Sequence, residues 1–289
     1  MVTSKLELKD GRLLAYTQFG DLKGMPVFFF HGTPGSRFFH PPNEISIKHG
    51  ARIITVDRPG YGESTFQPKR EILDWPKDIL QLADHLGFEK FSVTGHSGGG
   101  PYVFACTQSL KDRVTSSATI SGTGPLEAVT AISNISTVNR IGFQFGRYIP
   151  WLLWKIIINL IFHQRSQDPW KDIDKQTANR PLADSHLMKN PEIRSNCFLS
   201  EVEAFKPGLI GFAWDARLLT RPWGVNLDEI KVPVTIWHGM EDNQAPISMA
   251  QYLANKVPSC TARFIQGEAH LMLFNFWEEI LIGLIKPPK

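Results

Sequence analysis

The chain has 289 residues, of which 42% are hydrophobic and 20% charged, so it can bury a large core in one α/β domain or in one domain with an insertion. Its 31 basic and 28 acidic residues leave a net charge of +3, which is too small and scattered to indicate binding to nucleic acid or to an anionic membrane. The three cysteines lack the spacing of a metal site or a disulfide framework, and we expect neither a metal nor a cofactor.

The amino-terminal residues carry no apolar signal segment, and we therefore expect a cytoplasmic protein. A hairpin is predicted around Asp10-Gly11, between the segments 6–8 and 13–16. The runs at 27–30 and 53–56 are apolar without polar alternation. Such runs indicate strands of a parallel sheet that helices cover on both faces.

Helical and strand-like patterns alternate along the rest of the chain, apart from one long break. A helix is predicted from near Asp74, with its apolar residues on one face and Gly87 as its stop signal. The other predicted elements are strands at 91–94, 117–120, 232–237 and 262–265, a buried helix at 101–106 and a final amphipathic helix at 271–285.

The break between the sixth and seventh predicted strands has a different character. It is rich in Trp, Ile, Phe and Pro, shows helical periodicity and contains no strand-like run. We therefore expect a helical lid at 124–225, inserted after the sixth strand and covering the edge where the strands end. A core domain would then be built from residues 1–123 and 226–289.

One segment inside this lid, residues 149–162, is apolar enough to raise the question of a membrane span. It is shorter than the roughly 20 residues that a span requires, and Lys155 adds a charge. Lys155, Asn159 and His163 recur at every fourth position and predict one narrow polar stripe on a helix that is buried on its other sides. We expect no membrane span.

A serine in a G-x-S-x-G frame, Ser97 within Gly95–Gly99, directly follows the predicted strand at 91–94 and precedes the predicted buried helix. In this context a strand runs into a sharp turn with the serine at its apex. The neighbouring residues must be small because strand and helix backbones pass close to one another. Ser97 is therefore the candidate nucleophile.

A serine nucleophile requires a general base, and the base requires an orienting carboxylate. The strand predicted at 232–237 leads into Asp242, and the strand at 262–265 leads into His270. The order Ser97, Asp242, His270 is the one expected for a hydrolase whose serine lies in a G-x-S-x-G turn. Glu241 adjoins Asp242 and is an alternative for the acid.

Three other histidines also stand at strand ends. His96 immediately precedes Ser97, so we expect its side chain to point away from the hydroxyl. His31 and His238 are interpreted as structural residues that form hydrogen bonds in turns. His270 alone follows the acid after a further strand, and we predict it to be the base.

The oxyanion that forms on an attacked carbonyl needs two preorganised N–H donors. Gly98, directly after the nucleophile, supplies one of them. The second is expected from the loop after the strand at 27–30, where the Thr33 N–H is the best candidate because Pro34 has no N–H.

Taken together, these motifs resemble those of the α/β-hydrolase superfamily, and in particular its serine-nucleophile branch with an HG-x-P-G oxyanion loop. The matching pieces are HGTPGS at 31–36, DRPGYGES at 57–64, GHSGG at 95–99, GMEDNQAP at 239–246 and GEAH at 267–270. The resemblance implies an α/β-hydrolase fold, a mostly parallel central sheet flanked by helices. It assigns Ser97, Asp242 and His270 as the triad and Thr33 and Gly98 as oxyanion donors. The oxyanion loop is similar to that of proline iminopeptidases, but Gly98 stands where their nucleophile motif usually has tryptophan.

The function expected from these residues is that of a cofactor-free serine hydrolase, carboxylesterase-like, acting on small or medium, largely apolar acyl substrates. An aminopeptidase or another amide or C–C hydrolase of the same fold is an alternative. For an aminopeptidase, Glu201 or Glu203 in the lid would hold the free amine of the substrate. A ligand-binding receptor that retains the triad is a further alternative from a different class of protein.

Overall fold

A mixed sheet of eight strands forms the centre of the computed structural model, which describes residues 2–125 and 148–286 except for the side chains at 164–167, 169, 172 and 176. The strand order is β1-β2-β4-β3-β5-β6-β7-β8. The strands are β1 (Val2–Glu7), β2 (Leu13–Gly20), β3 (Met25–Phe30), β4 (Ala51–Val56), β5 (Phe91–His96), β6 (Val114–Ile120), β7 (Val234–Gly239) and β8 (Cys260–Ile265).

Strands β3 to β8 run parallel to one another, whereas β1 pairs antiparallel with β2 and β2 pairs antiparallel with β4. The predicted hairpin is confirmed, because Leu6 of β1 lies opposite Leu14 of β2. Gly11 in the connecting turn has a φ of +82°, a conformation that glycine adopts without steric cost. The parallel arrangement brings the carboxyl ends of β3 to β8 to one edge of the sheet.

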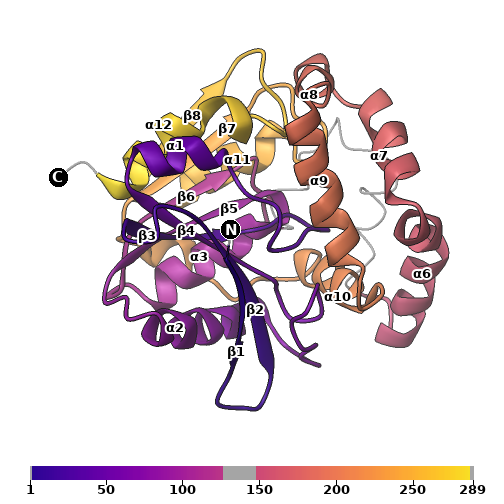
Figure 1. Ribbon diagram of the computed structural model, residues 1–289, viewed down its shortest axis with the longest axis horizontal. Coiled ribbons are helices and arrows are strands. Elements are labelled where there is room, and N and C mark those ends of the chain that lie inside the picture. Colours follow the sequence, from indigo (N-terminus) through magenta and orange to yellow (C-terminus); the bar gives the residue numbers. More distant parts are fainter. Residues whose placement is uncertain (1, 126–147, 287–289) are drawn as a thin grey trace.

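The apolar run of β3 shows why these strands have no polar alternation. Phe28 and Phe30 pack into one buried cluster, and Val27 and Phe29 pack into a second cluster on the opposite face. Helices α2 (Trp75–His85), α3 (Gly100–Ser109) and α11 (Ile247–Lys256) contribute to the first cluster. Helix α12 (Leu273–Ile285) contributes to the second, next to α1 (Asn43–Lys48), so both faces are covered by helices (Figure 1).

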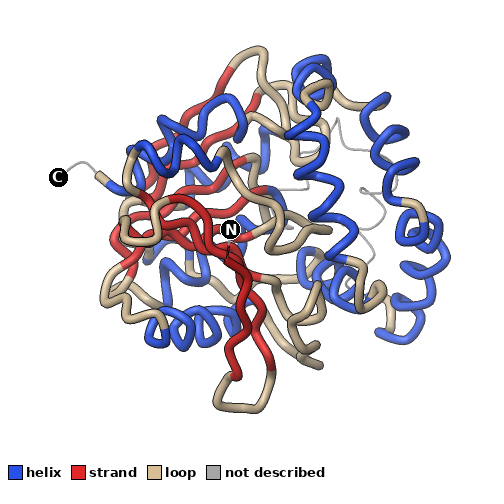
Figure 2. The backbone as a smooth tube through the Cα atoms, in the orientation of Figure 1, coloured by secondary structure: helices blue, strands red, loops and turns tan. Residues whose placement is uncertain are grey.

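Beyond β6, the described chain is helical until β7. These lid helices are α6 (Trp151–Gln167), α7 (Pro169–Ala178), α8 (Leu182–Leu187), α9 (Pro191–Ala204) and α10 (Ile210–Leu219). They lie together on one side of the sheet, at the right in Figures 1 and 2. Three short 3₁₀ helices complete the described elements: η1 (Ile72–Asp74), η2 (Ser97–Gly99) and η4 (Leu227–Glu229). The α/β-hydrolase fold is confirmed, and the described residues between β6 and β7 are helical, as the sequence predicts.

The first lid helix, α6, is less buried than its sequence predicts. Trp154 and Ile158 are buried and the Trp154 indole donates to the carbonyl of Ala213 in α10 at 2.8 Å. On the opposite side, however, Leu152 and Leu160 are 70% and 77% exposed. The prediction of a helix buried on every side but one polar stripe is therefore wrong. No helix among the described residues is long and apolar enough to cross a membrane.

Candidate active site

The segment around Ser97 forms a tight turn from β5 through η2 into α3. Ser97 has a φ of +54°, a conformation that non-glycine residues rarely adopt and that holds its side chain at the apex of the turn. A Cβ on Gly95 would lie 2.8 Å from the Gly99 carbonyl oxygen, and a Cβ on Gly99 would lie 2.3 Å from that of Phe30. Both positions therefore require glycine, as the sequence frame predicts.

Ser97 lines a cavity of about 550 Å³ between the carboxyl edge of the sheet and the lid helices. His270, Gly98 and Thr33 line the same cavity, so the structure brings together four of the five predicted site residues at its wall. The far wall is apolar and comes from α6 and α10, with Ile157, Ile158, Ile161, Phe162, Phe212 and Leu219.

Asp242 is the fifth predicted residue and lies directly behind His270. Its Oδ2 accepts a hydrogen bond from His270 Nδ1 at 2.8 Å, and its Oδ1 accepts from the backbone N–H groups of Gln244 and Ala245 at 2.8 and 3.0 Å. Burial by itself would raise the pKa of Asp242, but His270 and these hydrogen bonds outweigh burial and lower it. The carboxylate is thus kept ionised, and its hydrogen bond to Nδ1 orients the His270 ring.

Within the described part of the chain, Ser97 Oγ makes no hydrogen bond to His270, although both residues line the cavity. Contacts between a nucleophile and its base are often long in unliganded enzymes and shorten when substrate binds. Glu241, the alternative acid, is exposed, and no hydrogen bond joins it to His270 within the described chain; Asp242 makes that contact.

The other histidines at strand ends are buried and make hydrogen bonds with the backbone. His31 Nδ1 donates to the Gly32 carbonyl at 2.8 Å, and His238 Nε2 donates to the Ala245 carbonyl at 2.6 Å. His96 Nε2 donates to the carbonyl of His270 at 2.8 Å. Burial, together with the nearby His270, lowers the pKa of His96 to about 3, so this ring stays neutral and supports the segment that carries His270.

The two candidate oxyanion donors belong to segments that lie against each other. A Cβ on Gly98 would lie only 3.2 Å from the backbone nitrogen of Thr33, and the Thr33 side chain fills the remaining space. Gly98 is the second residue of η2, where backbone N–H groups have no partner within the helix. The backbone of Gly98 and the backbone nitrogen of Thr33 therefore lie beside each other at the wall of the cavity.

A buried arginine that the sequence analysis did not single out, Arg58, holds the loop that contains Thr33. Its guanidinium donates to the carbonyl of His31, to the carbonyl of Gly32 at 2.7 Å and to Thr33 Oγ1 at 3.0 Å. Its Nε donates to Asp215 Oδ2 at 2.7 Å. Arg58 and Asp215 are both completely buried, and Asp215 belongs to lid helix α10.

Asp215 also accepts hydrogen bonds from Arg70 and, at 2.8 Å, from Tyr102 in α3. Burial would raise the pKa of Asp215, but the two arginines overcome this effect and hold it well below its usual range. One lid carboxylate therefore neutralises two core arginines in a site without water contact. The sequence feature that could have identified Asp215 is its position as a lone acid within the apolar sequence of α10. An acid that is buried in such a helix is seldom without a partner.

A second buried lid acid was also missed. Asp184 of α8 accepts a hydrogen bond from the backbone N–H of Leu271, the residue after His270, at 2.8 Å. Its sequence surroundings carry no distinctive pattern. No group of three or more His, Cys, Asp or Glu residues in the described ranges is arranged to hold a metal ion.

The chain is similar to known proteins in sequence and in fold. Residues 25–152 match the family model described as alpha/beta hydrolase fold. The chain is 24% identical to a proline iminopeptidase of Lactobacillus helveticus over 85% of this chain and 83% of the relative. It is 26% identical to a bifunctional esterase/perhydrolase of Acinetobacter calcoaceticus, over 84% and 83%. The crystal structure of a bromoperoxidase from Bacillus anthracis superposes with a TM-score of 0.70 at 20% identity, over 99% of this chain and all of that one.

The buried charges around Asp215 lead to a stability prediction. Asp215→Asn leaves the charges of Arg58 and Arg70 without their carboxylate, and breaking a buried pair in this way costs about 3–5 kcal/mol. We expect urea denaturation to show that the free energy of unfolding of Asp215→Asn is lower than that of the wild type by this amount. Asp174→Asn, which removes an exposed lid acid paired with Arg194, is the matched control and should cost less than about 1 kcal/mol. Equal losses in the two variants would contradict the role assigned to Asp215.

The low pKa of His96 leads to a prediction about pH. Its pKa is about 3 in the folded protein and about 6.5 when unfolded, so the unfolded chain binds the proton more tightly and stability falls as pH decreases below 6.5. Between pH 7 and pH 5 this residue should reduce the free energy of unfolding by about 2 kcal/mol. The variant His96→Gln keeps an N–H donor but does not titrate. In urea titrations its free energy of unfolding should therefore fall by about 2 kcal/mol less than that of the wild type between pH 7 and pH 5. An identical pH dependence in the two proteins would argue against a neutral, buried His96.

Proposed function

Because the chain belongs to the α/β-hydrolase superfamily, we propose that it is a cofactor-free serine hydrolase with Ser97 as nucleophile, His270 as general base and Asp242 as the orienting acid. The observation that carries this proposal is the hydrogen bond of 2.8 Å between Asp242 and His270, made at the wall of the cavity into which the strained Ser97 turn projects. The relatives named as esterase and as proline iminopeptidase support the hydrolase class.

In the proposed reaction, Ser97 Oγ attacks the substrate carbonyl carbon while His270 Nε2 accepts the hydroxyl proton. The N–H groups of Thr33 and Gly98 stabilise the oxyanion, and each such donor contributes on the order of 3 kcal/mol. Collapse of the tetrahedral intermediate expels the leaving group, which takes the proton from His270, and forms an acyl-enzyme on Ser97. Water, deprotonated by His270, then attacks the acyl carbon. The second tetrahedral intermediate releases the acid as Ser97 Oγ takes the proton back from His270.

The substrate preference that we propose is for small or medium, largely apolar acyl groups bound under a lid. The far wall of the cavity supports it, since α6 and α10 present isoleucine, phenylalanine and leucine side chains to the space facing Ser97. A cavity of about 550 Å³ falls within the range of small-molecule sites. The proposal includes the division into a core of residues 1–123 and 226–289 and a lid at 124–225.

Hydrolysis of p-nitrophenyl esters of increasing acyl length tests the mechanism. We expect wild-type protein to show an optimum at short or medium chains, and Ser97→Ala to lose activity by on the order of a millionfold in kcat, because the variant has no nucleophile. Activity that is equal in the two proteins, or absent from the wild type across the series, would contradict the proposal.

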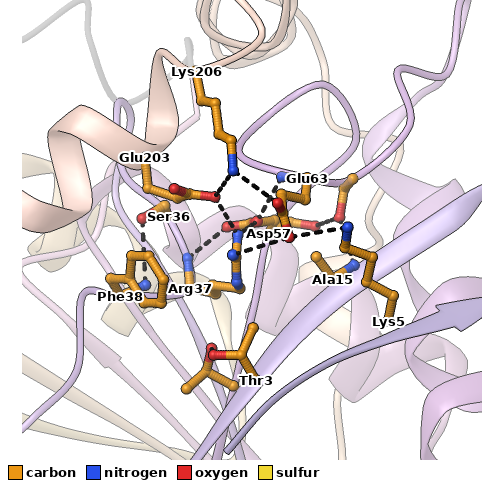
Figure 3. Close-up of polar contacts among 12 residues, drawn as sticks. Thr3, Lys5, Ala15, Ser36, Arg37, Phe38, Asp57, Glu63, Glu203 and Lys206 are labelled. Atoms are coloured by element: carbon orange, nitrogen blue, oxygen red, sulfur yellow. Dashed lines mark hydrogen bonds and ion pairs between the residues drawn. The ribbon is translucent and has the colours of Figure 1, made fainter.

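An aminopeptidase is the second candidate, and one observation on the lid favours it. Glu201 of α9 is buried and lines the cavity. Glu203, two residues further on, is held elsewhere, because its carboxylate lies 2.7 Å from Arg37 and 3.7 Å from Lys206 (Figure 3). Of the two glutamates considered for holding a free amine, Glu201 is the one that lines the cavity.

Glu201→Gln and Glu203→Gln form a matched pair of variants for this alternative. For an aminopeptidase, Glu201→Gln should reduce kcat/KM for a proline p-nitroanilide at least about tenfold, the loss expected when a charged hydrogen bond to substrate is removed. Glu203→Gln should leave that value within about twofold. If the wild type does not turn over the anilide, or if both variants match it, the aminopeptidase alternative is eliminated and the esterase proposal stands.

A further inference from the structure

The peptide group that joins His270 to Leu271 is held from two sides. Its carbonyl, that of His270, accepts a hydrogen bond of 2.8 Å from His96 Nε2, and His96 belongs to β5 of the core. Its N–H, that of Leu271, donates at 2.8 Å to Asp184 Oδ1, and Asp184 belongs to lid helix α8. The orientation of the peptide plane directly after the candidate base is thus fixed jointly by the core and by the lid.

Asp184 itself is firmly placed. Its side chain is completely buried, and its second oxygen lies 3.4 Å from Nη1 of Arg180. The side chain of Leu271 is buried in the same region, in a cluster with Ile173 of α7 and Met188. The lid therefore contacts the residue after His270 through both its backbone and its side chain.

We propose that Asp184 is a positioning residue of the hydrolytic site: by accepting the Leu271 N–H it fixes the peptide that follows His270 and keeps the imidazole aligned between Asp242 and Ser97. This inference rests on the proposed function. Asp184 reaches the site through the Leu271 backbone, so the contact acts on the peptide beside the base, although the Leu271 side chain also lines the cavity. Its loss should therefore lower the rate of the chemical step and leave substrate binding largely unchanged.

Three substitutions at position 184 separate the effect of the hydrogen bond from that of filling the buried space. Asp184→Asn keeps an oxygen that can accept the Leu271 N–H, whereas Asp184→Ala and the nearly isosteric Asp184→Leu cannot accept it. Asp174→Ala, in α7, is the control, because that acid is exposed and pairs with Arg194 instead. Folding of every variant is checked by circular dichroism and thermal denaturation.

The readouts are kcat and KM for the best p-nitrophenyl ester and the rate constant for inactivation by a small alkyl fluorophosphonate. In the inactivation a bond forms between Ser97 Oγ and phosphorus, fluoride leaves and His270 takes the proton, so the rate reports on nucleophile and base without acyl recognition. We expect Asp184→Ala and Asp184→Leu to lower kcat and the inactivation rate together by about 10- to 100-fold, since displacement of a catalytic group by about 1 Å has effects of that size. KM should stay within about threefold, and Asp184→Asn and Asp174→Ala should remain near wild type.

The inference is overturned if folded Asp184→Leu or Asp184→Ala matches the wild type, if KM rises while kcat is unchanged, or if Asp184→Asn loses as much as Asp184→Leu. If Asp184→Ala fails to fold, the test is the comparison of Asp184→Leu, which preserves the buried volume, with Asp184→Asn. Should neither fold while Asp184→Asn is fully active, a structural role replaces the positioning role. Wild-type protein that fails to react with the fluorophosphonate contradicts the proposed function itself, a result distinct from equal reactivity of wild type and variants.

Discussion

The buried contact of Asp215 with Arg58 and Arg70 is the interaction on which the arrangement of the site depends. A guanidinium without a partner in the interior would be strongly destabilising, so Arg58 can hold the carbonyls of His31 and Gly32 only while α10 supplies a carboxylate. Residues 157 positions apart in sequence thereby fix the conformation of the loop that carries Thr33. A lid helix is in this sense part of the scaffold for the candidate oxyanion donors.

The lid reaches the site at a second place, through the Leu271 N–H that Asp184 accepts. The two lid acids act on two different segments at the cavity wall: Asp215 acts, through Arg58, on the segment that contains Thr33, and Asp184 contacts the one that contains His270. Both acids are completely buried, and in the interior hydrogen bonds are strong and an unpaired polar group is costly. The lid helices therefore do more than cover the cavity, because they complete the hydrogen bonding of two of the segments that form the candidate site.

Burial and polar partners have opposite effects on the pKa values of Asp242, Asp215 and His96, and which effect is larger differs among the three residues. For Asp242 and Asp215, nearby cationic or hydrogen-bonding groups outweigh burial and the carboxylates stay ionised. For His96 burial prevails, helped by His270, and the ring stays neutral. The result is one anion hydrogen-bonded to His270 and neutral supporting histidines around it, which is the charge distribution that the proposed role of His270 as general base requires.

Much of this protein follows from local sequence. Unbroken apolar runs such as 27–30 predicted a parallel sheet covered on both faces, and the glycines around Ser97 predicted a tight strand–turn–helix segment, because backbone sterics act between near neighbours. The order of Ser97, Asp242 and His270 likewise came from the sequence alone. Tertiary structure decided which neighbouring acid meets His270 and which lid glutamate lines the cavity. It also exposed one apolar side of α6 and paired Asp215 with Arg58. These outcomes depend on contacts between distant segments, and distant contacts leave no periodic trace in the sequence of either partner.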